Sequence, residues 1–598
     1  MKRMLNEAQD FRSEMVDGYV RAYRHILRAA PGGAGVIANH VPDPGKVTVV
    51  VGGGSGHYPA FYGLVGQGIA GAAAIGAIYT SPSGEWAYQV AKAAHGGAGV
   101  LFTFGNYAGD VMNFGMAETR LQAEGIDART VLVTDDVLSA PPEEADRRRG
   151  IGGGFYVFKT AGAAAARGDS LADVEAITRR ANERVRTAGI AFGGCTVPGQ
   201  TEPLFTVADG MMEVGLGIHG EPGIRVQEQL PAREIAKLLI DALLAEAPAG
   251  SGSEVGVLVN GLGGTKYEEM FVLYSGIAPL LEDAGLSVHE TQIGEFVTAL
   301  DTPGCSVSLF WLDDDLKPLH DATARTPAYT RIGPDVAGAA NLLASARSVA
   351  AAAMDTVQSA AAVIQDAVGG GADASGGTAG ETARAALARA QEAIAAIESD
   401  LGRLDALAGD GDHGAGMVRG FRAANEALAG AVGTARDTMV RGGTAFQNAA
   451  GGASGALVGA FLIALGSALP AVDDHVDGQA YARALASGLA TIQKLGGAQP
   501  GDKTMIDTLT PFVEALEKAA ARGTDLAAAW REALPAAEGG MKSTADMVSK
   551  RGRASRLGER SRGHQDPGAT SMYEILMAFG KAFDERAAES QGQGGEEA

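Results

Sequence analysis

Apolar, β-branched runs that end directly in glycine-rich turns recur through the first half of the chain. The run at 46–51 (KVTVVV) leads straight into GGGSGH. The same pattern returns at 99–104, 130–134 and 254–259. Helical patterns, such as those at 170–187 and 231–244, lie between the runs. Alternating strands and helices predict an α/β fold with ligand-binding groups at the carboxyl ends of the strands.

The strand pattern stops at about residue 333. An alanine-rich stretch at 336–368 is followed by GGGADASGGTAG, whose composition is typical of a tether with a root-mean-square span of about 20 Å. Helical patterns then continue at 381–399, 434–447, 480–495, 506–522, 525–537 and 571–588. We therefore expect an α/β region at 1–333 with two subdomains that meet near Cys195, a linker at 334–380, an all-α domain at 381–588 and a disordered tail at 589–598.

Charge and composition exclude several kinds of partner. The net charge is −22, which disfavours binding to nucleic acids and to anionic membranes. No stretch approaches eighteen uninterrupted apolar residues, and no signal-peptide-like segment is present. The two cysteines, Cys195 and Cys305, allow one disulfide at most and have no activating neighbour in the sequence. We expect a cytoplasmic protein that binds neither nucleic acid nor membrane.

Three carboxylates lie close together in LDALAGDGDH. Asp405, Asp410 and Asp412 would not share one face of an unbroken helix, but Gly409 and Gly411 interrupt it and let the segment curl. Converging carboxylates repel one another unless a divalent cation neutralises them, and oxygen ligands without thiolates favour Mg²⁺. A solvated acidic turn is the plain alternative.

Further along the helical half, the motif GGASGAL opens an apolar helix. Its amide groups and Ser454 form a suitable anion cradle at a helix N-terminus, although small residues also serve close helix packing. Nearby motifs add Lys503, Thr504, Arg553 and Asp566. Carboxylates for a metal, an amide cradle and cationic groups are the parts that phosphoryl transfer requires. No Walker sequence is present, so a nucleotide site here belongs to another class.

Three polar residues stand out in the α/β half. His57 and Asp110 follow predicted strands, and His219 lies in the glycine-rich turn GIHGEPG. His219 is a candidate base or nucleophile, and Asp110 is a candidate general base for a hydroxyl. A core histidine and a helix-capping aspartate are the alternatives. Asp135 and Asp136 are expected to cap a helix or to bind water.

These motifs together resemble the single-chain, ATP-dependent dihydroxyacetone kinases over nearly the whole chain. The matching segments, in order, are GGGSGH, SPS, NYAGDVMNFG, RRRGIGGGFYVFKTAGAAA, GIHGEPG, VNGLGG, GDGDHG, GGASGAL, GDKTMID and GRASRLGERSRGHQDPGA. The resemblance implies a ketose-binding α/β region of two subdomains. It further implies a nucleotide-binding barrel of about eight up-and-down helices, and a homodimer.

The resemblance also implies roles for particular residues. His219 would bind the ketone of a small ketose as a hemiaminal, and His57 and Asp110 would contact the reacting hydroxyls. Asp405, Asp410 and Asp412 would hold two Mg²⁺ ions against ATP. The substrate contacts would include Gly53, Gly54, Ser55, Gly56, Tyr58 and Gly105. The nucleotide contacts would include His413, Gly452, Ser454, Gly455, Thr504, Arg553 and Asp566.

The sequence departs from the family pattern at two of these positions. Tyr58 replaces a common glutamate, and Gly105 replaces a lysine that contacts substrate. Loss of the lysine opens space, and a phenol can both donate and accept a hydrogen bond. These changes favour erythrulose, one carbon larger, over dihydroxyacetone, although Tyr58 can also be a packing residue.

Two other functions fit the same resemblance. One is cyclising FAD–AMP lysis, which would use the nucleotide domain alone and would not need His219. The other is a non-catalytic ketose sensor or phosphorelay adaptor. Fusion of both units in one chain favours turnover of free ATP. The sequence leaves open which ketose and enantiomer is preferred, and whether each nucleotide domain serves its own chain.

Overall fold

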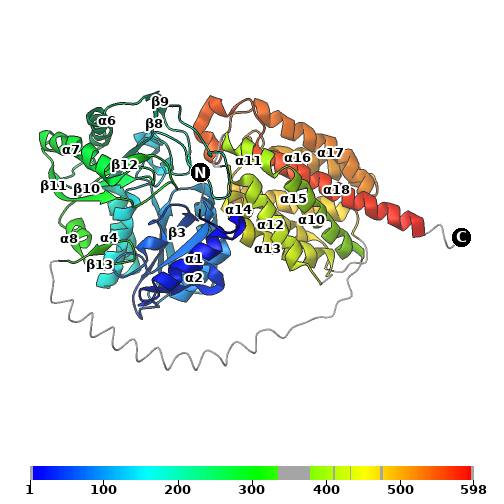
Figure 1. Cartoon of the computed structure of the whole chain (residues 1–598). Helices are drawn as coiled ribbons and strands as arrows, with labels where there is room; N and C mark the ends of the chain where they lie inside the picture. The colour runs from blue at the N-terminus through cyan, green and yellow to red at the C-terminus, as the bar shows by residue number, and fades with distance from the viewer. Residues whose placement is uncertain (1–3, 334–377, 408–410, 431–432, 472–475, 594–598) are drawn as a thin grey trace.

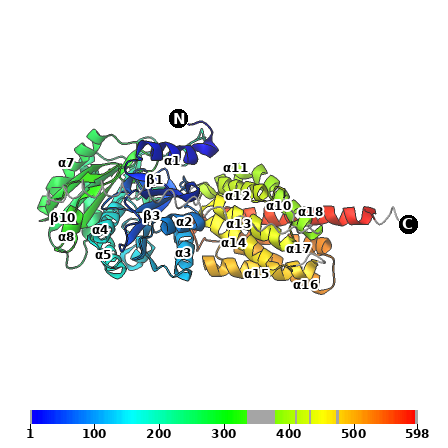
Figure 2. The ribbon, with the colours of Figure 1, turned by 90° about the horizontal axis from the view of Figure 1, so that it is seen from below.

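The computed structural model describes residues 4–333, 378–407, 411–430, 433–471 and 476–593. An α/β half and a helical half lie side by side (Figure 1), and the view turned by 90° shows the same division (Figure 2). The fold class predicted from the sequence is confirmed. None of the described helices has the length and apolar character needed to cross a membrane.

A six-stranded sheet forms the core of the first subdomain. Its order is β1 (Leu27–Ala29), β2 (Gly35–Ala38), β4 (Ala72–Ile78), β3 (Thr48–Ser55), β5 (Val100–Gly105) and β6 (Ala128–Val133). The strands from β4 to β6 are parallel. Strand β3 is buried along its whole length, so its apolar run of valines is explained by burial on both faces. The strand continues through the glycines and ends at Ser55, so His57 lies just beyond its carboxyl end.

A second six-stranded sheet follows. Its order is β11 (Ser287–Gly294), β10 (Glu254–Gly261), β12 (Gly304–Trp311), β7 (Val185–Ala191), β8 (Met211–Val214) and β9 (Arg225–Glu228). Only the β10–β11 pair is parallel. Because β7 already belongs to this sheet, the predicted boundary near Cys195 is too late, and the predicted helix at 170–187 ends at Glu183. A short hairpin, β13 (Ala324–Arg325) and β14 (Thr330–Arg331), closes the α/β half.

Helices cover the two sheets and join them. They are α1 (Phe11–Ala22), α2 (Gly84–Ala94), α3 (Ala108–Ala123), α4 (Gly154–Arg167), α5 (Leu171–Glu183), α6 (Ala232–Ala245), α7 (Tyr267–Asp283) and α8 (Leu316–Asp321). Helices α2 and α3 pack together on the first sheet, as do α4 and α5, whereas α6 and α7 pack on the second. The Tyr156 ring of α4 stacks on Phe310 of β12 at 4.8 Å, so α4 binds both sheets into one body.

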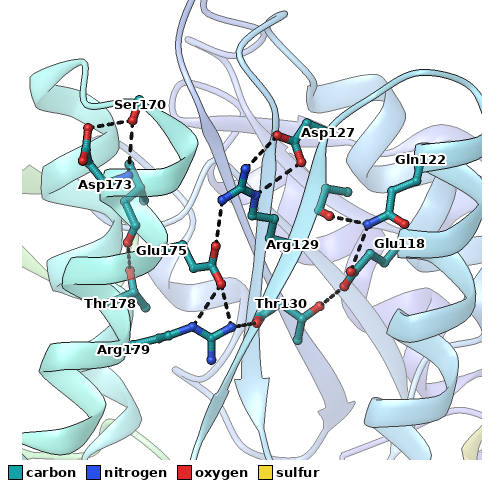
Figure 3. A network of polar contacts seen from close by, with 12 residues as sticks. Glu118, Gln122, Asp127, Arg129, Thr130, Ser170, Asp173, Glu175, Thr178 and Arg179 are labelled. Carbon is teal, nitrogen blue, oxygen red and sulfur yellow. Dashed lines mark hydrogen bonds and ion pairs between the residues drawn. The ribbon is translucent and has the colours of Figure 1, made fainter.

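The outer edge of the first sheet is closed by polar side chains. Strand β6 ends the sheet, and Figure 3 shows the ion pairs and hydrogen bonds beside it. Arg179 of α5 donates to the Thr130 carbonyl at 3.1 Å, and Gln122 of α3 donates to the Ala128 carbonyl at 2.8 Å. Arg129 joins Glu175 at 2.9 Å. Such surface pairs add little stability, but they occupy carbonyls that would otherwise template another strand.

The helical half contains nine helices in the described residues. They are α10 (Thr378–Ala396), α11 (Glu398–Ala406), α12 (His413–Ala427), α13 (Ala435–Ala450), α14 (Gly452–Ala468), α15 (Gly478–Gly496), α16 (Met505–Ala521), α17 (Leu526–Ser543) and α18 (Pro567–Gln593). From α12 to α18 each helix packs on the next, and α10 closes the ring against α18 and α12. Eight helices therefore form the barrel, and α11 packs on its outside against α12 and α18.

The predicted domain ends differ slightly from the observed ones. Helix α10 begins within the segment assigned to the linker, and α18 continues through 589–593, which were expected to be disordered. The remainder of the predicted linker, 334–377, and the residues 594–598 lie outside the described residues.

Candidate active site

His57 is fixed just beyond the carboxyl end of β3. The residue is fully buried, and its Nδ1 lies 2.8 Å from the Thr298 carbonyl oxygen. A carbonyl only accepts, so Nδ1 carries the proton and Nε2 keeps its lone pair. The contact fixes His57 as a hydrogen-bond acceptor or base on its other side.

His219 meets His57 inside an aromatic pocket. The two imidazoles are in edge contact at 4.7 Å, and the Tyr107 ring contacts His219 at 4.6 Å. Tyr79 stacks on His57 at 4.9 Å and has a positive φ of 58°. A tyrosine in this strained backbone region is uncommon and is often found at functional sites. Histidines far apart in the sequence thus share one buried pocket.

Asp110 lies in the first turn of α3, shortly after Tyr107, and is 8% exposed. The same end of α3 meets the helical domain. An ideal Cβ on Gly109 would lie 3.1 Å from the Ala453 nitrogen, and the Asn113 amide donates to the Gly452 carbonyl at 3.1 Å. The N-terminal turn of α3, which carries Asp110, therefore lies against the glycine-rich turn of α14, and Tyr107 just before it contacts His219.

The glycines of GGGSGH are used mainly for packing. A Cβ on Gly53 would lie 2.3 Å from the Phe61 ring, and one on Gly54 would lie 2.7 Å from the backbone of Tyr79 and Thr80. Gly56 has φ +98° and faces the Tyr79 ring. Ser55 differs, because its buried hydroxyl has no hydrogen-bond partner among the described residues. Close packing thus accounts for Gly53 and Gly54, and Ser55 remains a candidate substrate contact.

Tyr58 does not contact the histidine pocket. Its half-buried ring packs against Tyr19 at 6.0 Å and Tyr62 at 5.3 Å, and burial raises its pKa to about 12. These ring contacts favour the packing alternative for Tyr58 over a role in substrate binding. At Gly105 a Cβ would lie 2.7 Å from the Tyr107 ring, so that ring fills the space next to the glycine.

Two of the three predicted metal carboxylates are described, and they come together at the start of α12. The His413 backbone amide points to Asp405 Oδ2 at 3.3 Å, and Asp412 precedes it at the N-cap. Thr80, at the end of the first sheet, donates to Asp412 Oδ2 at 2.5 Å. Asp410 lies outside the described residues. No motif pointed to Thr80, which is 332 positions from its partner.

Asp566 joins this carboxylate group. Burial raises its pKa to about 7, with Asp405 and Asp507 also raising it and Lys503 opposing them. Its Oδ2 accepts from the Ala569 amide at 2.8 Å, so it also caps α18. Oxygen donors that repel one another in a partly buried setting fit a divalent cation such as Mg²⁺.

Several predicted nucleotide contacts have structural tasks. His413 is buried and joins Ser454 at 2.7 Å and Ser571 at 2.9 Å, and burial lowers its pKa. It therefore clamps α12 to α14 and α18. Thr504 caps α16 by accepting from the Ile506 amide at 3.2 Å. Gly455 packs against Ala450, with a Cβ distance of 3.2 Å.

The turn before α14 is built from two glycines with positive φ, Gly451 and Gly452. The Gly452 amide donates to the Ser81 carbonyl at 3.1 Å, so the predicted anion cradle abuts the α/β domain. The side chain of Arg553 lies outside the described part of the chain.

A second polar cluster lies away from this site. Ligand atoms of His289, His320 and Asp321 lie within 4.8 Å of one another. Arg331 pairs with both Asp321 and Glu290 beside them. The guanidinium already supplies the positive charge that a metal would bring, so this cluster is a structural ion network.

Two buried histidines among aromatic rings lie on one side of a domain boundary, and carboxylates and a glycine-opened helix lie on the other, which fits a two-domain small-molecule kinase. Dak1 domain sequences match residues 17–328, and DAK2 domain sequences match residues 407–581. The chain belongs to the dihydroxyacetone kinase family.

Named relatives cover almost the whole chain. It is 45% identical to the D-erythrulose kinase of Mycolicibacterium smegmatis, over 96% of this chain and 97% of the relative. It is 43% identical to the L-erythrulose kinase of Pectobacterium atrosepticum, over 97% and 96%. The crystal structure of the dihydroxyacetone kinase from C. freundii in complex with AMP-PNP and Mg²⁺ matches with 26% identity and a TM-score of 0.51, over 97% of this chain and 99% of that one.

Proposed function

We propose that the protein is an ATP-dependent kinase that phosphorylates a terminal hydroxyl of a small ketose. The observation that carries this function is the position of the N-terminal turn of α3. Asp110 lies in it, Tyr107 before it contacts His219, and Gly109 and Asn113 within α3 meet the glycine turn of α14. A ketose held at His219 is thereby presented to a nucleotide held by the helical domain.

The residues divide the chemistry between them. His219 holds the ketone carbon as a hemiaminal, which selects ketones over polyols such as glycerol because glycerol has no carbonyl. Asp110 accepts the proton of the terminal hydroxyl as it attacks phosphorus, and Nε2 of His57 orients that hydroxyl or assists the transfer. The contact between the two domains limits the access of water to the transferred phosphoryl group.

Asp405, Asp410 and Asp412 would hold Mg²⁺ against the phosphates of ATP. When bound, the metal would supply charge neutralisation and orientation of the phosphates. The related structure, which contains AMP-PNP and Mg²⁺, supports ATP and Mg²⁺ as the nucleotide and the metal of this site. The direct test is release of ADP by purified protein given only ketose, Mg²⁺ and ATP. No ketose-dependent ADP would contradict the proposal and leave the lyase and the phosphorelay adaptor, neither of which the relatives named above favour.

We also propose that the enzyme is a cytoplasmic homodimer. Both cysteines are free and buried, which fits a reducing compartment. Sedimentation of the purified enzyme as a single chain of 60.8 kDa would contradict the dimer.

Erythrulose is the expected preferred substrate, with dihydroxyacetone as the poorer one. The names of two relatives support it. A hydrogen bond to the extra hydroxyl of erythrulose contributes about 1–3 kcal/mol to binding. The kcat/KM for one erythrulose enantiomer should therefore exceed that for dihydroxyacetone by about 10- to 100-fold. Steady-state rates with both enantiomers and dihydroxyacetone measure this.

The Tyr58→Phe variant is the matched control for this preference. Since Tyr58 lies in the tyrosine cluster with Tyr19 and Tyr62, its hydroxyl should not affect the ratio of kcat/KM values. A tenfold or greater preference for dihydroxyacetone over both enantiomers would refute the expectation.

A further inference from the structure

The carboxylate of Glu221 holds His219 at two points. Its Oε1 lies 3.0 Å from the imidazole Nδ1, and its Oε2 accepts from the His219 backbone amide at 3.0 Å. Both residues are buried, with exposures of 5% for His219 and 3% for Glu221. An ionised carboxylate only accepts, so the ring proton resides on Nδ1 and the lone pair on Nε2. The contact selects which nitrogen of His219 is nucleophilic.

Glu221 is in turn confined beside a buried cation. An ideal Cβ on Gly217 would lie 2.1 Å from Glu221 Oε2 and 2.5 Å from Arg149 Nη1. The two charged groups therefore approach each other over a position that only glycine can occupy without displacing them. Burial alone would lower the pKa of Arg149, but Asp136 and Glu221 raise it above its ordinary value.

Asp136 completes the arrangement from the other side. Its Oδ2 lies 2.7 Å from Arg149 Nη2, and Arg149 Nη2 also donates to the Gly215 carbonyl at 2.7 Å. Asp136 is fully buried and Arg149 is 2% exposed. A buried pair of this kind persists only with good geometry and further hydrogen bonds, both of which are present. The expectation that Asp136 caps a helix or binds water is thus replaced by a role as the partner of Arg149.

We propose that Glu221 is a positioning residue for His219, supported by Arg149 and Asp136, and that it prepares Nε2 for attack on the ketose carbonyl. The proposal rests on the proposed function, because it concerns the same hemiaminal. Together Asp136, Arg149 and Glu221 carry one excess negative charge in a buried setting. A positive charge that develops on the His219 ring is therefore stabilised there.

The covalent step conserves atoms and charge. The Nε2 lone pair forms the carbon–nitrogen bond while the π pair of the carbonyl moves to oxygen, which takes one proton from solvent. The ring is positively charged until its Nδ1 proton leaves by way of Glu221 to solvent, so no net proton is consumed. Glu221 thus faces the charge at the stage where it is largest.

Two variants of the full-length protein test this role, and Glu213→Gln is the matched control. Glu221→Gln keeps an acceptor for Nδ1 but removes the charge, and Glu221→Ala removes both. Glu213 stabilises the same loop, because its Oε1 accepts a hydrogen bond from the Gly223 amide at 2.6 Å. It makes no hydrogen bond to His219. Calorimetric affinity for dihydroxyacetone without nucleotide, and kcat/KM for ketose and for ATP, are the readouts.

Glu221→Gln should lower dihydroxyacetone affinity and ketose kcat/KM by about 10- to 100-fold, and Glu221→Ala should lower them further, with the KM for ATP unchanged. In ¹⁵N-histidine spectra, with His219→Gln for assignment, the Nδ1–H tautomer should persist in Glu221→Gln and be lost in Glu221→Ala. Wild-type affinity in both Glu221 variants, or an equal loss in Glu213→Gln, would overturn the proposal while leaving the kinase function standing. Wild-type ketose turnover in His219→Gln would instead overturn the hemiaminal itself.

Discussion

Asp412→Asn should lower kcat by about 10³-fold, because the carboxylate that we propose to hold the metal loses its charge while the side chain keeps its shape. The substituted amide retains an oxygen that can accept from Thr80, whose hydroxyl lies 2.5 Å from Asp412 in the native protein. The contact between the domains is thereby preserved, and the loss can be assigned to the charge. Coupled detection of ADP over a range of Mg²⁺ concentrations measures both kcat and the metal requirement.

The matched control is Asp400→Asn on α11, which removes an exposed carboxylate paired with Arg403. Its turnover should equal that of the native enzyme. The metal assignment fails if Asp412→Asn turns over at a near-native rate with the same dependence on Mg²⁺.

His219→Gln should lower kcat/KM for ketose by about 10³-fold or more, because the variant has no nucleophile for the carbonyl. The neutral imidazole is the attacking form, because a protonated ring has no lone pair at Nε2 for the carbonyl carbon. Ketose-soaked crystals give the decisive measurement, since a reversible adduct can be lost before mass spectrometry.

Continuous density from the ketose to His219 is expected in the native enzyme and not in the variant. His25→Gln, a change at an exposed histidine of the same domain, serves as the control and should leave kcat/KM unaltered. Well-ordered ketose without a covalent link, or a link to another histidine, would contradict the role of His219.

Local sequence patterns predicted the class of fold, and they named the histidines and carboxylates of the candidate site. Valine runs ending in glycine marked β3 and β10, and the loss of such runs marked the helical half. Strand β4 (AAAIGAI) was not predicted because alanine favours helices. Strand β7 was not predicted because a single residue, Arg184, separates it from α5, and the expected helix ran on into it. In each case burial in the sheet overrode the local preference.

The contacts that set the chemistry of the site were beyond local patterns. Thr298 fixes the tautomer of His57 from 241 positions away, and the Tyr58 ring packs against Tyr62 in a tyrosine cluster. The contact between Glu221 and His219 differs, because Glu221 follows His219 by two residues in GIHGEPG and a carboxylate at that position can be read from the sequence. Pairing a candidate nucleophile with acidic neighbours in its own turn would have found it.

The α/β half and the helical half fit each other so closely that neither can be replaced by the corresponding domain of another protein without changes at the contact surface. A Cβ on Gly451 would lie 2.7 Å from the Ser81 carbonyl oxygen, and one on Gly109 would lie 3.1 Å from the Ala453 nitrogen. Leu204 similarly faces Gly411, with a Cβ distance of 2.7 Å. A chimera that joins this helical domain to the α/β domain of another kinase will therefore work only if both sides of the seam are transplanted as one unit, and substitutions there must accumulate in matched pairs.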